Sequence, residues 1–348
     1  MCRSSLHPFL LNLPKCEHHL HLEGTLAPSL LFNLASRNGI TLPKDDAAFG
    51  SPSSLLARYS RFTSLDDFLH YYFVGMSTLV HAEDFEDLAW NYFVKANEHC
   101  VKHAEVFFDP QAHTDRGIAF GTILKGFETA CARARNDFGI SSMLIPCFLR
   151  HLPMQSSLST WKDMLPDLKS RRLAGIGLSG SEKGYPPGCW SDIYAEAERL
   201  DIKRTAHAGE EGPVAYIREA LETCNIQRID HGMRLADDED LMRKVSERNI
   251  LVTLCPLSNL TLKCIADVKE LPIRRFLDAG VPFSINSDDP SYFVSFVQEN
   301  YCAVQEAFNL TVDEWLQIAD NAVSGSWCDD ERKVFLKQTI ATVAQSYR

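Results

Sequence analysis

The chain has 348 residues, of which 45% are hydrophobic and 23% are charged, a balance that is typical of globular proteins and excludes wholesale disorder. Its 46 acidic residues outnumber its 35 lysines and arginines, giving a net charge of −11, so we expect no nucleic-acid partner. Because the sequence contains no run of about 18 apolar residues, we also expect no membrane span and no membrane partner.

The 11 cysteines are scattered along the chain and form no Cys-x-x-Cys pair. Such a set is typical of reduced thiols in a reducing compartment. The first 15 residues carry only a short apolar patch, Phe9 to Leu13, and no cleavage site, which argues against a secretory signal. We therefore predict a cytoplasmic protein, and a nuclear fraction or a homo-oligomer is compatible with the sequence.

Short apolar runs alternate with longer helical stretches along the chain. The helical candidates are residues 84–100, 121–136, 191–200, 214–224, 239–248 and 273–279. The runs expected as strands are residues 16–22, 104–108, 143–149, 174–178, 204–206, 228–231, 250–255 and 282–286. Strands that alternate with helices form a parallel sheet. Eight such strands predict an α/β fold, a (β/α)8 TIM barrel that forms a single domain over residues 1–348, although a doubly wound open sheet would give a similar pattern.

Two segments of the chain are additional to the eight strands and the helices that connect them. Residues 27–78 have helical character and are too long for one crossover, so we predict a helical cap inserted after the first strand. The residues beyond Asn309 are expected to form helices that complete the outer ring. The barrel is favoured over an open sheet because candidate ligands end several strands that are far apart in sequence, and a barrel brings all strand ends to one rim.

The first of these candidates lies in residues 17–24, Glu-His-His-Leu-His-Leu-Glu-Gly. On a strand, alternate side chains share a face, so His19 and His21 point the same way and can grip one metal ion, whereas His18 faces the helical layer. The alternative is that these are two unrelated histidines on a polar strand edge. For the His-x-His motif alone, the two interpretations have about even odds.

The second candidate is residues 205–210, Thr-Ala-His-Ala-Gly-Glu, where a short strand ends at His207. His207 is a candidate third metal ligand, and Glu210 would lie over the same pocket and could transfer protons. The neighbouring Glu211 is expected to be solvated. Taken alone, this motif would be weak evidence for a functional site.

Two further strand ends carry similar residues: His231 precedes a glycine, and Asp288 and Asp289 follow an apolar strand. As neighbours on extended backbone, the two aspartates should point to opposite sides and have different tasks. The alternative is that one of them caps the next helix. Together the four motifs offer nitrogen and oxygen ligands without thiolates, a set that suits zinc with an open position for water.

A competing motif, Gly-x-Gly-x-x-Gly, occupies residues 175–180. In a dinucleotide-binding site these glycines open a helix, but Gly184, Pro186, Pro187 and Gly188 follow and forbid one. We therefore expect a loop whose backbone lines the pocket. The zinc-binding patterns His-Glu-x-x-His and His-x-Glu…Pro-Cys-x-x-Cys are both absent from the sequence.

Residues 14–26, together with His-Ala-Gly-Glu, Asp-His-Gly and Ser-Asp-Asp-Pro, resemble the adenosine and adenine deaminase family of the amidohydrolase superfamily. Several details are most similar to the fungal-type adenine deaminase branch: Glu23, residues 105–111, Glu182 with residues 184–187, residues 255–259, and residues 286–290 with Tyr292 and Phe293. Two positions depart from the family: His18 replaces the usual Leu, and Ser179-Gly180 replaces the more frequent Asp-Ser.

The resemblance implies a role for each site residue. His19, His21, His207 and Asp288 would bind one zinc ion per chain. Glu210 would protonate the purine at N1, and His231 would orient and deprotonate the attacking water. Asp289 would hydrogen-bond the imidazole side of the purine, and the backbone around Gly180 would meet N3.

The expected reaction is the hydrolysis of adenine to hypoxanthine and ammonia in purine salvage. Glu23 is one methylene longer than the Asp usual in adenosine deaminases, and we expect it to crowd the space that a ribose would need. An adenosine deaminase or a deaminase of N6-substituted adenine is the nearest alternative. A non-catalytic purine- or metal-binding barrel belongs to another class, and it would be marked by loss of motif residues that are all present here.

Overall fold

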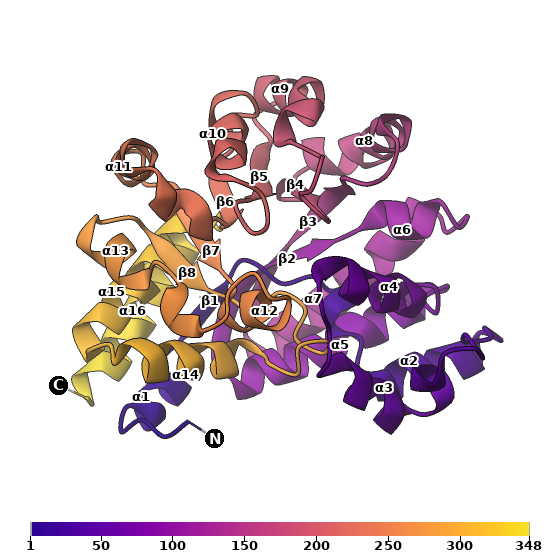
Figure 1. The fold of residues 1–348 in the computed structure, drawn as a ribbon, viewed down its shortest axis with the longest axis horizontal. Helices are drawn as coiled ribbons and strands as arrows, with labels where there is room; N and C mark the ends of the chain where they lie inside the picture. The colour runs from indigo at the N-terminus through magenta and orange to yellow at the C-terminus, as the bar shows by residue number, and fades with distance from the viewer. Residues whose placement is uncertain (1, 348) are drawn as a thin grey trace.

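The computed structural model describes residues 2–347, and Figure 1 shows their arrangement. Eight parallel strands form one sheet in the order β1 to β8, which is also their order in the chain. The strands are β1 (Lys15–Glu17), β2 (Val101–Phe108), β3 (Ser141–Leu149), β4 (Gly175–Ser179), β5 (Lys203–Ala208), β6 (Arg228–His231), β7 (Leu251–Leu254) and β8 (Phe283–Ile285). Each overlaps a predicted run. A doubly wound sheet would show a break in this order, so the barrel prediction is confirmed.

The first and last strands meet just beyond their regular parts, which closes the sheet. The backbone N–H of His21 donates to the carbonyl of Asp288 at 2.9 Å, and the N–H of Asp288 donates to the carbonyl of His19 at 3.0 Å. A parallel bridge pairs Leu20 with Asp288 in the same place. The closure of the barrel therefore brings the first predicted metal-binding motif beside the last one.

Helices surround the barrel (Figure 1). The crossover helices are α5 (Ala82–Glu98), α7 (Phe120–Phe138), α8 (Met154–Lys169), α9 (Ser191–Arg199), α10 (Val214–Glu222), α11 (Glu239–Glu247) and α13 (Ile273–Asp278). All six predicted helices are confirmed, and α8 is an addition. Three C-terminal helices, α14 (Val297–Phe308), α15 (Val312–Gly325) and α16 (Asp330–Gln345), complete the ring as expected. Short helices are α1 (His7–Asn12), α6 (Pro110–Thr114) and α12 (Pro256–Thr261), the last two directly after β2 and β7.

The predicted insertion after the first strand is helical. It contains α2 (Pro28–Arg37), α3 (Pro52–Tyr59) and α4 (Leu65–Met76). Ser64 begins α4, because its hydroxyl accepts the backbone N–H of Asp67 at 3.2 Å. The apolar face of α4 points inward, and Phe68 packs against Phe293 with ring centroids 5.0 Å apart. This helix therefore forms a roof beside the loop that follows β8.

The opposite end of the barrel is closed by charged groups that are fully buried. Glu105 on β2 pairs with Arg228 at the start of β6, and its other oxygen lies 3.0 Å from Nε2 of His103. Buried charges of this kind persist only when they are paired. The floor is thus structural, and the open chemistry lies at the carboxyl ends of the strands. No helix within residues 2–347 has both the length and the apolar composition needed to cross a bilayer.

Candidate active site

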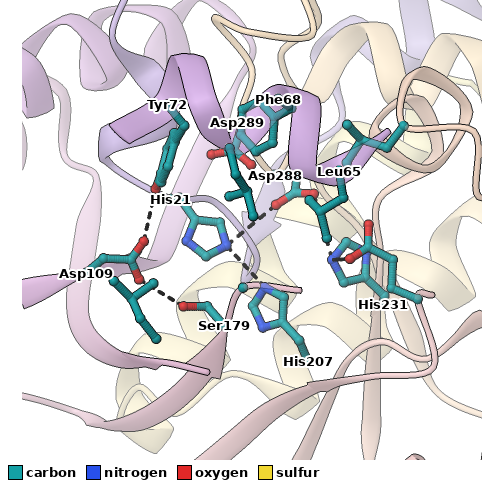
Figure 2. A pocket seen from close by; sticks show the side chains of 15 residues that line it. His21, Leu65, Phe68, Tyr72, Asp109, Ser179, His207, His231, Asp288 and Asp289 are labelled. Carbon is teal, nitrogen blue, oxygen red and sulfur yellow. Dashed lines mark hydrogen bonds and ion pairs between the residues drawn. The ribbon is translucent and has the colours of Figure 1, made fainter. Parts of the chain in front are cut away.

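A cavity lies at the carboxyl ends of the strands, beneath α4 (Figure 2). Its wall combines side chains from the roof helix with residues that end the strands. They are Leu65, Phe68, Leu69 and Tyr72 from α4, and His21, Asp109, Leu149, Ser179, Gly180, His207, Glu210, His231, Leu262, Asp288 and Asp289 from the barrel and its loops. The barrel thus brings most of the predicted site residues together. Of the others, His19 lies within the same cluster, and Glu23 lies behind the wall.

Three imidazoles and one carboxylate converge at the base of the cavity. Nε2 of His19 and Nε2 of His21 lie 3.3 and 3.6 Å from Oδ1 of Asp288. Nε2 of His21 also lies 3.2 Å from Nε2 of His207. A metal that binds four donors tetrahedrally at about 2.1 Å separates them by about 3.4 Å, so these spacings fit one ion.

The electronic state of the cluster fits a cation as well. Burial lowers the pKa of His21 to about 3 and also lowers the pKa of His207, so both rings are neutral and carry free lone pairs. Nε2 of His19 is buried and has no hydrogen-bond partner among the described residues. Burial works to raise the pKa of Asp288, but His19, His231 and His21 together hold it well below its usual value. A divalent metal would satisfy all of these groups.

Outer residues hold the candidate ligands in place. Oγ1 of Thr253 lies 2.9 Å from Nδ1 of His19, and Oγ of Ser258 donates to Oδ2 of Asp288 at 2.6 Å. Oδ2 of Asp230 lies 3.6 Å from Nδ1 of His207. Such partners fix the ring orientation and the charge of metal ligands. The sequence motifs assigned no role to either residue, although Ser258 belongs to the family-like segment 255–259.

His231 lies close enough to the cluster to compete with His21 as a ligand. The donor atoms of His19, His207, His231 and Asp288 all lie within 4.8 Å of one another. However, Nε2 of His231 is 3.8 Å from Asp288 and nearer, at 3.4 Å, to Glu210. The backbone of His231 has φ 60°, a conformation that is rare for non-glycine residues and is often retained at functional sites.

The backbone at the end of β8 differs from the expectation. Asp288 has φ 65°, which is left-handed and not extended, because its backbone is bonded to the segment after β1. The two aspartates nevertheless meet different surroundings. Asp288 joins the imidazoles, whereas Asp289 lines the cavity and its Oδ1 is buried without a partner among the described residues. Burial and the charge of Asp288 raise the pKa of Asp289 well above its usual value.

Glu210 is suited to carry a proton at neutral pH. Burial, and then the charges of Asp288, Glu182 and Glu211, raise its pKa well above the usual value. Nδ2 of Asn259 donates to Oε1 of Glu210 at 3.3 Å. The group therefore combines a position on the cavity wall with a raised pKa that favours the protonated carboxyl, which is what a general acid requires.

The loop that carries Glu210 is held by Glu182. Oε2 of Glu182 accepts the backbone N–H groups of Gly209 at 3.1 Å and Gly212 at 2.8 Å, and Oε1 accepts that of Glu210 at 3.1 Å. A side chain at Gly212 would collide with this carboxylate. The neighbouring Glu211 is not solvated as expected: its side chain is 10% exposed and pairs with Lys183 at 2.9 Å.

Replacing Glu182 with Gln is expected to lower kcat by about 10- to 100-fold, since an amide cannot accept all three hydrogen bonds and a buried N–H would stay unpaired. Steady-state kinetics and metal analysis would check this, and the metal content should not change. The matched control is Glu211→Gln on the same loop, which also removes a negative charge near Glu210 but no hydrogen bond to the loop backbone, and which should alter kcat by less than about threefold. Equal losses in the two variants would contradict the positioning role of Glu182.

Gly180 follows β4 directly and has φ 86°, which a residue with a side chain would adopt only with strain. The other two glycines of the Gly-x-Gly-x-x-Gly motif lie inside β4, so they do not open a helix. His18 points away from the cluster, with Nδ1 3.2 Å from Oγ of Ser284 and Nε2 2.7 Å from Oγ of Ser326.

Glu23 does not line the cavity, contrary to the expectation that it crowds the substrate directly. It is fully buried, and its Oε1 accepts the backbone N–H of Asp109 at 3.0 Å and lies 3.0 Å from Nε2 of His113. The carboxyl that reaches the cavity is that of Asp109, whose pKa is raised to about 8 by burial and by the charge of Glu23. Asp109 ends β2 and could have been found by the same strand-end rule. Tyr72 could not, because the roof helix carries no such signal.

Comparison with known proteins places this site in a family. A sequence profile described as adenosine deaminase matches residues 14–343. The chain belongs to the adenosine deaminase family. It is 51% identical to the adenine deaminase of Schizosaccharomyces pombe, over 100% of this chain and 95% of the relative.

Two solved structures extend the comparison to the fold. The crystal structure of an adenine deaminase from Arthrobacter aurescens superimposes with a TM-score of 0.90 at 38% identity, covering 96% of this chain and 99% of the other. An amidohydrolase from Burkholderia ambifaria, solved with bound Zn, superimposes with a TM-score of 0.87 at 25% identity, covering 99% and 97% of the two chains. The resemblance expected from the sequence is thereby confirmed at the level of family and fold.

Proposed function

We propose that this protein hydrolyses adenine to hypoxanthine and ammonia with one zinc ion per chain. The observation that carries the proposal is the buried cluster of three imidazoles and Asp288 beside Glu210, whose pKa is raised by burial. The full-length similarity to the Schizosaccharomyces pombe adenine deaminase supports the substrate. The zinc found in the Burkholderia amidohydrolase, and the preference of zinc for nitrogen and oxygen donors, support the metal.

His19, His21, His207 and Asp288 would hold the zinc ion. When it is bound there, the ion lowers the pKa of a water molecule and so supplies a nucleophile near neutral pH. His231, whose Nε2 faces both Glu210 and Asp288, orients that water and takes its proton. Asp289 hydrogen-bonds N7 of the purine, and the backbone at Gly180 meets N3.

The reaction is the replacement of the exocyclic amino group by oxygen. Glu210 gives its proton to N1, which makes C6 more electrophilic as water adds there. The carbon–nitrogen bond to the amino group then breaks, the nitrogen takes the proton that His231 removed from the water, and ammonia leaves. The hydroxyl on C6 loses its proton to Glu210 as the carbonyl of hypoxanthine forms. This is the chemistry of a hydrolase that acts on the carbon–nitrogen bond of a cyclic amidine, and its product would enter purine salvage.

The first experiment supplies the purified protein separately with adenine, adenosine and N6-methyladenine, and follows ammonia release and the ultraviolet spectrum. We expect turnover of adenine alone, which a chelator abolishes and zinc restores. Turnover of adenosine or N6-methyladenine alone would keep the chemistry and replace the substrate. Zinc binding without turnover of any of the three would favour a non-catalytic purine-binding barrel.

Three further properties stay predictions: a cytoplasmic location with or without a nuclear fraction, the absence of nucleic-acid and membrane partners, and a single domain over residues 1–348. A homo-oligomer is compatible with the sequence.

A further inference from the structure

Asp109 is a buried group on the cavity wall that the chemistry above does not use. It is 2% exposed and stands where β2 ends. Oγ of Ser179 donates to its Oδ1 at 2.9 Å, and Oη of Tyr72 donates to its Oδ2 at 3.2 Å (Figure 2). Because a carboxyl oxygen accepts up to two hydrogen bonds, the group keeps acceptor capacity in the ionised and in the protonated state.

The place of Asp109 on the wall is fixed by its neighbours. Ser179, which bonds its side chain, is followed directly by Gly180. On the other side, Glu23 accepts the backbone N–H of Asp109, and the next residue, Gly24, packs directly against Asp289. Asp109, Gly180 and Asp289 all line the same cavity, and Ser179 and the Glu23–Gly24 turn connect Asp109 to the other two.

The order of atoms in a purine indicates which ring nitrogen would lie next to Asp109. This step rests on the proposed function. If Gly180 meets N3 and Asp289 meets N7, the nitrogen that lies between them along the ring edge is N9. We propose that Asp109 is the subsite for N9–H of a free 6-aminopurine, and that it makes the site select the free base over its nucleoside. In a nucleoside, N9 is bonded to the sugar carbon and has no hydrogen to donate.

The structure around Asp109 supports such selection by holding the carboxyl still. Nη2 of Arg116 donates to Nδ1 of His113 at 3.0 Å, so Nε2 of the neutral ring carries the hydrogen and donates to Glu23. Glu23 in turn accepts the backbone N–H of Asp109 at 3.0 Å. This chain of contacts makes Glu23 a positioning residue for Asp109.

The roof helix leaves no polar partner for a sugar beside Asp109. The hydroxyl of Tyr72 on α4 donates its hydrogen bond to Asp109. The other side chains of α4 on the cavity wall are apolar: Leu65, Phe68 and Leu69. A ribose at N9 would meet this apolar surface and would leave the carboxyl of Asp109 buried without a ligand partner. Both effects disfavour the nucleoside.

The test compares adenine with 9-methyladenine, which replaces the N9 hydrogen by a methyl group, in the zinc-loaded wild type and in Asp109→Ser. In the wild type we expect kcat/KM for 9-methyladenine to be lower by about 10³-fold or more, as for sites that hydrogen-bond an N–H of their substrate. In Asp109→Ser, kcat/KM for adenine should fall by about 100-fold or more, and the two substrates should differ by less than about tenfold.

The ratio between the two substrates is the decisive readout, because a general loss of structure lowers both values equally. Asp115→Ser, at an exposed position after α6, is the matched control and should keep the wild-type ratio. Should Asp109→Ser not fold, Tyr72→Phe removes one donor to Asp109 and keeps the ring, and it should reduce the ratio by about fivefold.

Two results would overturn the proposal: a wild type that uses 9-methyladenine as well as adenine, or variants at Asp109 and Tyr72 that keep the wild-type ratio. Failure of the proposed function is visible separately, as a wild type that does not deaminate adenine. In that case, calorimetry would measure the affinities of the same proteins for adenine and for 9-methyladenine. The ratio of the two affinities then replaces the ratio of kcat/KM values as the test.

Discussion

Replacing Glu210 with Gln is expected to lower kcat by about 10²–10⁴-fold and to leave the bound metal unchanged. The reason is that the amide has nearly the shape of the protonated carboxyl but cannot deliver a proton to the substrate. Glu210 is buried and its pKa is raised, which favours the protonated state that the reaction uses. Steady-state kinetics with adenine and metal analysis of the same samples would measure both quantities.

The pH profile gives this prediction a second readout. A carboxyl whose pKa is raised is protonated below that pKa, so the donor form is lost as pH rises through it. The wild type should therefore lose kcat/KM on the alkaline side of that pKa, and Glu210→Gln should lack this limb. Inactivity that accompanies loss of the metal would contradict the assignment of Glu210 as the acid, because it would show a structural effect.

Replacing His19 with Ala is expected to weaken metal binding by more than about 100-fold, beyond the effect of removing an outer partner, and to abolish turnover with it. Nε2 of His19 is 3.3 Å from Oδ1 of Asp288, and it has no hydrogen-bond partner among the described residues. Its removal leaves three donors where four fit one ion. Metal content after dialysis and activity with and without added zinc would measure the effect.

The neighbouring histidine supplies a matched control. His18→Leu also removes a buried imidazole from the same segment, but its contacts are with Ser284 and Ser326 and not with the cluster. It should keep the metal, although it loses stability. Because a ligand that binds only the folded state stabilises it, a chelator should lower Tm of the wild type and of His18→Leu but not of His19→Ala. A full metal equivalent in His19→Ala would rule out the ligand role.

Much of the candidate site could be predicted from the sequence because barrels collect strand ends. His19, His21, His207, His231 and the Asp288–Asp289 pair each close a recognisable strand, and the observed order of strands places them at one rim. The identity of the family also followed from local motifs, since those motifs carry the chemistry. For these residues the local sequence and the fold agree.

Other parts of the site depend on contacts between segments that are distant in sequence. The strained backbone at Asp288 arises from its pairing with the segment after β1, which no local pattern encodes. Glu23 was expected to contact the substrate, yet it lies behind Asp109 because the turn after β1 packs against the end of β2. The roof over the cavity, with Tyr72, belongs to the inserted helices.

The sequence by itself determined the class of fold, the metal-binding residue types and the family, because each depends on spacing along one strand or on the alternation of strands and helices. The tertiary structure alone decided which carboxyl reaches the cavity, which carboxyl is protonated and what holds it. The physical reason is that burial and the distances to other charges set the pKa and the reach of a side chain, and both are fixed only when the barrel closes.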